Sequence, residues 1–245
     1  QAETSLPDDP RIRLRVLRRV GAAQRTLTDH TGAHDSLSRA AAIAAEHFGP
    51  RDPRTLEVRL EALTIALSAR RLDGIGAQAQ ALAADCVRVL GADHPVTLRA
   101  RAHVTHTVRA EGWLEELDSI RRRMEEIGLT GTSEHLEVLN LQVRAATATD
   151  SPDALELSAR AMLLASEARG PTHSQAVEAS LAHVRALRLA GEFERAGEVL
   201  EPLALMISRV FGEQTVTFRL ATVERWALAF EVGDAPRALE FAQLY

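Results

Sequence analysis

Four side chains suited to binding anions recur at helical spacing between residues 99 and 109. Arg99, His103, His106 and Arg109 fall at positions i, i+4, i+7 and i+10, which places them on one side of an α-helix. Guanidinium groups bind carboxylates and phosphates through charge-assisted, bidentate hydrogen bonds. The pattern therefore predicts a basic stripe that can clamp an acidic partner. The alternative is an ordinary solvated helix face.

Metal coordination is the other chemistry that paired histidines offer. His103 and His106 lie three residues apart, and His30 and His34 lie four apart. Either spacing can place two imidazoles on one face of a helix. Neither pair has a cysteine or carboxylate that clearly completes a set of ligands. We therefore expect solvated or capping histidines, with no metal site and no cofactor.

The sequence contains none of the common catalytic or nucleotide-binding motifs. Gly-x-Ser-x-Gly, Gly-x-x-x-x-Gly-Lys, Gly-x-Gly-x-x-Gly and His-Glu-x-x-His are all absent. The single cysteine, Cys86, lies in an apolar helical stripe and is predicted to be a small buried hydrophobic residue. Trp113 and Trp226 are predicted to be packing residues. The chain is therefore not expected to be an enzyme.

Composition narrows the class of protein further. The 245 residues are 46% hydrophobic and 26% charged, with a formal net charge of −5, which gives no sign of a nucleic-acid or membrane surface. All 29 basic residues are arginine and Asn140 is the only asparagine, a usage typical of GC-rich bacterial genomes such as those of actinobacteria. One cysteine and no visible signal peptide fit a cytoplasmic location.

A glycine recurs at a nearly constant interval and divides the chain into repeats. The intervals are 42, 40, 39 and 42 residues, and three further glycines each follow one of these by 21 residues. The stretches between them carry apolar residues at helical spacing, as in Leu56, Leu60 and Leu63. Six units and about twelve helices follow. The five repeat starts are Gly49, Gly91, Gly131, Gly170 and Gly212.

The repeated unit resembles a known family. Leu90-Gly91-Ala92-Asp93-His94-Pro95 and its counterparts, followed by Gly-x-[Phe/Trp] and a second helix, are similar to the 42-residue tetratricopeptide repeat of kinesin light chains. The resemblance extends from about Asp8 to Tyr245. It implies an all-α, right-handed α-solenoid of stacked antiparallel helix pairs. His94 and His173 occupy repeat positions at a helix entry and are expected to be structural.

The resemblance also implies a division of residues 1–245 as one solenoid domain. The expected units are 8–48, 49–90, 91–130, 131–169, 170–211 and 212–245, and we expect the chain to be a fragment of a longer protein because the last unit is short. The family often has asparagines in the first helix of each unit that grip a peptide backbone. Those places hold Glu61, His103, Val143, Ala182 and Glu224 here, so this device does not carry over.

The family resemblance predicts a protein-interaction or peptide-sensing module, the binding part of a bacterial signalling or transcription regulator. Its partner is expected to be a protein or peptide that is acidic or has a free carboxylate, with no nucleic acid or membrane bound by this segment. A self-associating scaffold, a homodimer, is the alternative, and an enzyme accessory domain is the third reading. The first helices line the concave face in this family, so the expected partner-binding residues are Glu61, Arg99, His103, His106, Arg109, Arg185 and Arg188.

Overall fold

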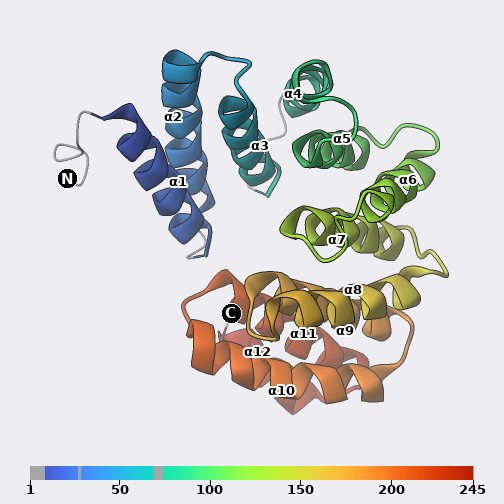
Figure 1. Ribbon diagram of the computed structural model, residues 1–245. Helices are drawn as coiled ribbons and strands as arrows, with labels where there is room; N and C mark the ends of the chain where they lie inside the picture. Colours follow the sequence, from blue (N-terminus) through green and yellow to red (C-terminus); the bar gives the residue numbers. More distant parts are fainter. Residues whose placement is uncertain (1–8, 27–28, 69–73, 245) are drawn as a thin grey trace. The chain divides into compact units, whose positions relative to one another are not determined.

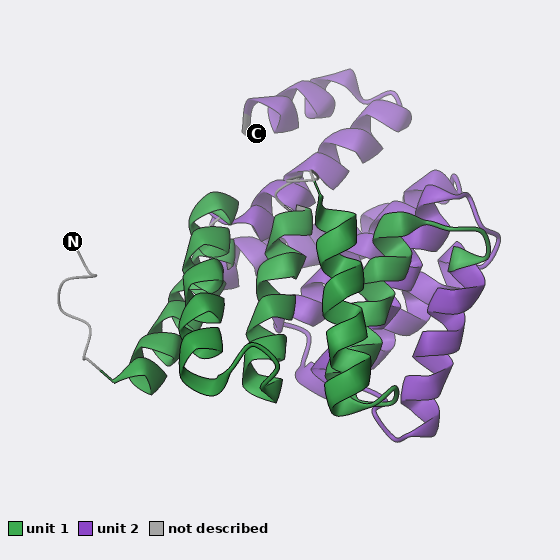
Figure 2. Ribbon diagram, turned by 90° about the horizontal axis from the view of Figure 1, so that it is seen from above, with its two compact units in different colours: residues 1–113 green, residues 114–245 purple. Residues whose placement is uncertain are grey.

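A computed structural model describes residues 9–26, 29–68 and 74–244 of the chain. These residues form twelve α-helices and no strand, and consecutive helices pack in pairs (Figure 1). The chain divides into two compact units, residues 1–113 and 114–245, which Figure 2 colours separately. The all-α helix-pair fold is therefore confirmed, whereas the six unit boundaries stay a prediction.

The first compact unit contains five helices and the opening residue of a sixth. Its buried core is formed by leucines and alanines that face one another across neighbouring helices, among them Leu56, Leu60 and Ala79. Cys86 lies in this core, where burial raises the pKa of its thiol to about 11. The prediction that Cys86 is a small buried residue is thus confirmed. The helices are α1 (Pro10–Thr26), α2 (His30–Phe48), α3 (Pro53–Ser68), α4 (Ile75–Leu90) and α5 (Pro95–Val108).

The second compact unit is built in the same way. Leu181, Leu200 and Ile207 are buried where three successive helices meet, and a smaller cluster joins the last two helices. Its helices are α6 (Trp113–Glu126, which begins at the last residue of the first unit), α7 (Ser133–Ala148), α8 (Ala154–Arg169), α9 (Ser174–Leu189), α10 (Phe193–Phe211), α11 (Val216–Glu231) and α12 (Ala235–Leu244).

The repeated glycines and histidines end one helix and start the next. Gly170 ends α8 with φ of 86°, a left-handed conformation that glycine adopts without strain. His173 then caps α9, because its Nδ1 accepts a hydrogen bond from the backbone N–H of Gln175 at 3.3 Å. His94 caps α5 in the same way through the N–H of Val96. The structural role predicted for these two histidines is confirmed.

Candidate functional site

An ion pair joins α1 and α3 in the first compact unit, and one of its carboxylates belongs to the predicted site residue Glu61. Arg18 on α1 donates from Nε to Glu61 on α3 at 3.0 Å and from Nη2 to Glu57 at 3.0 Å. The hydrogen bond that Arg18 donates to Glu61 is the main reason that the pKa of Arg18 is raised above its ordinary value. Glu61 therefore serves as an internal acceptor here. The sequence analysis did not identify Arg18, although its 43-residue separation from Glu61 is close to the repeat length.

The predicted basic stripe on α5 is divided between the interior and the surface. His103 is buried, and its Nε2 lies 3.3 Å from the hydroxyl of Thr64 on α3. Arg99 is half-buried, whereas Arg109 is exposed beyond the end of the helix. The four side chains thus do not share one open surface, because neighbouring helices cover part of α5.

His106 and Arg109 meet at Trp113, the first residue of α6. The imidazole of His106 meets the indole edge-on at 6.2 Å between centroids. The guanidinium carbon of Arg109 lies 5.2 Å from the indole centroid, within the range of a cation–π contact. Nε of Arg109 also donates to the backbone carbonyl of His106 at 3.3 Å. This arrangement, which we call the Arg109–Trp113 cluster, holds the guanidinium of Arg109 over the indole ring of Trp113.

Arg185 and Arg188 converge on one carboxylate in the second unit. Both donate to Glu224 on α11, Arg185 at 2.8 Å and Arg188 at 3.2 Å from their Nε atoms. Arg188 also pairs with Glu231. The sequence placed the two arginines on one helix face correctly, but their charge is met by acids 36 to 43 residues further along the chain.

A second polar cluster lies between α6, α7 and α8. Glu125 Oε1 accepts from Arg121 and Arg160, each at 2.8 Å, and from His135 Nε2 at 3.1 Å. Nδ1 of His135 accepts from the backbone N–H of Gly131 at 3.4 Å, so the ring is neutral with its proton on Nε2. Burial lowers the pKa of His135 despite the opposing effect of Glu125. This cluster joins three helices through one carboxylate.

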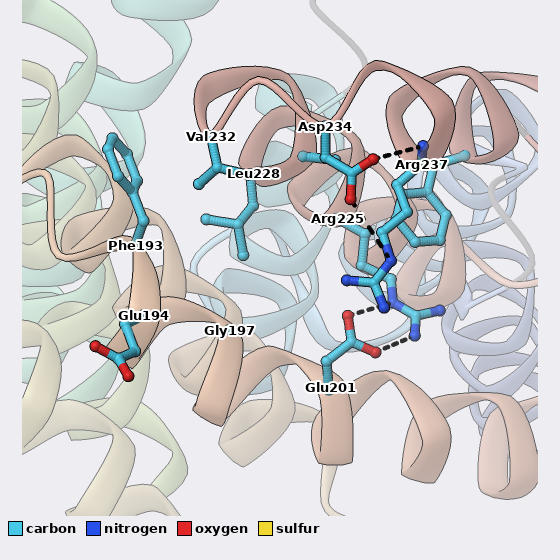
Figure 3. Close-up of a pocket in the computed structure, with 11 residues that line it drawn as sticks. Phe193, Glu194, Gly197, Glu201, Arg225, Leu228, Val232, Asp234 and Arg237 are labelled. Atoms are coloured by element: carbon cyan, nitrogen blue, oxygen red, sulfur yellow. Dashed lines mark hydrogen bonds and ion pairs between the residues drawn. The ribbon is translucent and has the colours of Figure 1, made fainter.

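A pocket of about 330 Å³ opens between α10, α11 and α12 (Figure 3). Phe193, Leu228 and Val232 form an apolar part of its lining. Four of the five charged side chains in its lining pair with one another, Arg225 with Glu201 and Arg237 with Asp234. The fifth is Glu194. The pocket can therefore accept an apolar side chain. Sequence reasoning missed it because residues from three helices line it.

The described residues hold no group of three or more side chains suited to a metal ion, and none of their helices is long and apolar enough to cross a membrane. In these ranges the sites with polar or cationic groups are the ion-paired faces, the Arg109–Trp113 cluster and the pocket edge. Among them, the Arg109–Trp113 cluster combines exposure with a cation that is held in place.

Comparison with known proteins supports the fold. No protein-family model matches the chain, and no curated protein matches it. Two solved structures of nearly identical TPR-like repeats of a kinesin light chain from Podosopora anserina are similar to it. One, a point variant of those repeats, has a TM-score of 0.54 at 17% identity and covers 80% of this chain and 95% of its own. The other has a TM-score of 0.52 at 17% identity, covering 83% and 98%. The chain thus has the TPR-like helical-repeat fold.

Proposed function

We propose that this chain is a protein-interaction module that binds an acidic polypeptide segment at the Arg109–Trp113 cluster. The observation that carries the proposal is the exposed guanidinium of Arg109 held over the indole of Trp113. Arginine and tryptophan are enriched among the residues that dominate binding energy at protein interfaces. A guanidinium held in one position also loses less conformational entropy when it binds a carboxylate.

The ion pairs of Arg185 and Arg188 make Arg109 the better candidate for binding a partner. Arg185 and Arg188 already pair with Glu224. Among the described residues, no carboxylate forms an ion pair with Arg109, whose Nε bonds a carbonyl instead. A carboxylate of another polypeptide can therefore bind the terminal N–H groups of its guanidinium. Of the predicted residues, Arg109 and the neighbouring His106 are the best placed to meet a partner.

The helical-repeat architecture suits this role. Stacked helix pairs present extended surfaces on which a chain can lie, and such surfaces serve binding in many repeat proteins. The role that we propose is the binding part of a larger bacterial signalling or transcription regulator in the cytoplasm. There, a segment with carboxylates beside an apolar side chain would contact Arg109 and Trp113 together.

Arg109→Gly provides a clean test because the backbone of Arg109 favours glycine. Its φ of 51° is left-handed, so glycine removes the guanidinium without adding strain. Asp150→Gly is the matched control, since Asp150 has φ of 49° and lies in the other unit. A peptide-display library selected on the wild-type chain should enrich sequences that place carboxylates beside an apolar residue.

The enriched peptides should bind Arg109→Gly at least about tenfold more weakly, a loss of ~1.4 kcal/mol, and Asp150→Gly with unchanged affinity. Fluorescence polarisation with one labelled peptide measures both. Unchanged affinity of Arg109→Gly, or a library that enriches no carboxylates, would contradict the proposal.

A further inference from the structure

The pocket between α10, α11 and α12 keeps apolar side chains in contact with water. Phe193 and Leu228, which line it, are only half-buried, and Val232 is 54% exposed. Single exposed apolar residues are common, but a hollow lined by several of them marks a place where a ligand can bind. Every residue of the lining lies in the second compact unit. The pocket therefore shares no residue with the Arg109–Trp113 cluster.

Gly197 leaves space in the wall of this pocket. It lies inside α10, where glycine destabilises a helix relative to alanine. Its φ is not left-handed. Among the described residues, a Cβ atom there would have one neighbour within 4 Å, the side chain of Leu228 at 3.7 Å, which is an ordinary van der Waals contact. Neither the backbone conformation nor close packing therefore requires glycine here. Its effect is to leave the backbone of α10 open to a ligand in the pocket.

The charges in the pocket lining leave one carboxylate without a counterion. Arg225 pairs with Glu201, and Arg237 pairs with Asp234. Glu194 also lines the pocket, but it forms no ion pair with any described residue. In the view of Figure 3, part of the apolar lining lies between Glu194 and these two ion pairs. The lining therefore carries an uncompensated negative charge at the end of the pocket away from the ion pairs.

The size and charge of the pocket indicate what kind of ligand fits it. Small-molecule sites enclose most of their ligand, whereas this pocket of about 330 Å³ leaves Val232 largely exposed. It suits a single apolar side chain that anchors a longer partner outside the pocket. A carboxylate beside Glu194 would meet a like charge, whereas a lysine or arginine would supply the counterion. Glu198, one turn further along α10 and also without an ion pair among the described residues, offers a second carboxylate to a longer segment.

We propose that this pocket binds a basic polypeptide segment of another protein. An apolar side chain of the segment lies between Gly197 and Leu228, where it removes apolar surface from water. A lysine or arginine next to it in the segment pairs with Glu194, which selects against acidic segments. The chain then has two sites of opposite preference, since the Arg109–Trp113 cluster favours carboxylates. The two proposals rest on different residues, so either can fail without the other.

Peptide display on the 245-residue chain with Arg109→Gly tests the proposal, because this variant lacks the cation of the other proposed site. The enriched sequences should place lysine or arginine beside an apolar residue. One of these peptides is then labelled and titrated with the wild-type chain and with pocket variants by fluorescence polarisation. A selection that enriches no such sequences would overturn the proposal and would leave that for Arg109 untouched.

Two substitutions of Gly197 test whether the apolar side chain occupies the pocket. Gly197→Leu fills the space beside Leu228 and should weaken binding of the labelled peptide about tenfold or more. Gly197→Ala is the matched control, because it adds only the Cβ atom for which there is room, and it should bind within about twofold of the wild type. Circular dichroism checks that both variants fold. If Gly197→Leu binds as tightly as Gly197→Ala, the pocket is not the binding site.

A neutral substitution of Glu194 tests the charge preference. Glu194→Gln should weaken binding about threefold, and the difference from the wild type should shrink as salt is raised to about 1 M. Glu167→Gln is the control, since Glu167 is exposed on α8 and also forms no ion pair with a described residue. It should bind the peptide like the wild type. Equal effects of the two substitutions would contradict the assignment of Glu194 as the counterion of the segment.

Discussion

Arg188 on α9 and Glu224 on α11 form an ion pair from which water is largely excluded. Their side chains are 12% and 5% exposed, and Nε lies 3.2 Å from Oε2. A more exposed ion pair joins the corresponding helices of the first unit, where Arg18 on α1 binds Glu61 on α3. Glu61 and Glu224 occupy corresponding places in their repeats. In both places, the carboxylate joins the first helices of two consecutive helix pairs.

Glu224→Gln should lower the free energy of unfolding by about 2 kcal/mol, because it removes the buried carboxylate that accepts hydrogen bonds from both Arg185 and Arg188. Urea unfolding followed by circular dichroism measures the change. Glu126→Gln is the control, since Glu126 pairs with Arg123 at the surface, and such pairs contribute about 1 kcal/mol or less. Equal effects of the two substitutions would show that the Glu224 pair is no stronger than a surface pair.

Arg185→Glu should destabilise the fold, because it places a second carboxylate beside Glu224, whose oxygen lies 2.8 Å from the Arg185 guanidinium. Arg185→Met retains the apolar stem and should cost less stability. The difference between their urea midpoints measures the repulsion. If Arg185→Glu and Arg185→Met unfold at the same urea concentration, no such repulsion exists. A loss of partner binding in Arg185→Glu would then be a direct effect on the binding surface.

The sequence predicts the helices of this chain better than their contacts. Gly170 and His173 end and start helices through their own backbone conformation and capping hydrogen bonds, so such signals can be recognised from the sequence alone. The Glu224 pair depends instead on how two helices align across a repeat. Trp226 shows the same limit: it was expected to be a packing residue, yet it is 41% exposed, because no described helix covers that side of α11.

Asp150→Gly should raise the free energy of unfolding by about 0.5–1 kcal/mol. Asp150 has φ of 49° just after α7, and relief of left-handed strain exceeds the entropy that glycine adds to the unfolded chain. Arg109→Gly relieves similar strain but loses the contact with Trp113, worth about 0.5–1 kcal/mol at the surface, so its stability should stay near that of the wild type. Thermal unfolding of both variants measures this. A destabilised Asp150→Gly would show that its carboxylate has a stabilising role.

His135 should make the second unit less stable as pH falls. Burial lowers the pKa of its imidazole below the ordinary value of 6.5, so the unfolded chain takes up a proton at a higher pH than the folded chain does. Because stability rises with pH wherever the unfolded state binds more protons, the contribution is complete above pH 6.5 and is lost as pH falls towards the folded pKa. His183 is also buried with a lowered pKa and acts in the same direction.

Glu125 adds a second step at lower pH. Although burial alone would raise its pKa, the hydrogen bond from Arg121 and the nearby charges hold it below 4.5, so its contribution is lost as pH falls below that value. Melting temperatures between about pH 7.5 and pH 5.5 isolate the histidine effect. His135→Phe should be less stable at about pH 7.5, because Glu125 and Gly131 lose a hydrogen-bond partner, but its melting temperature should fall less over this interval. An equal fall in both proteins would show that His135 does not titrate differently in the folded and unfolded chains.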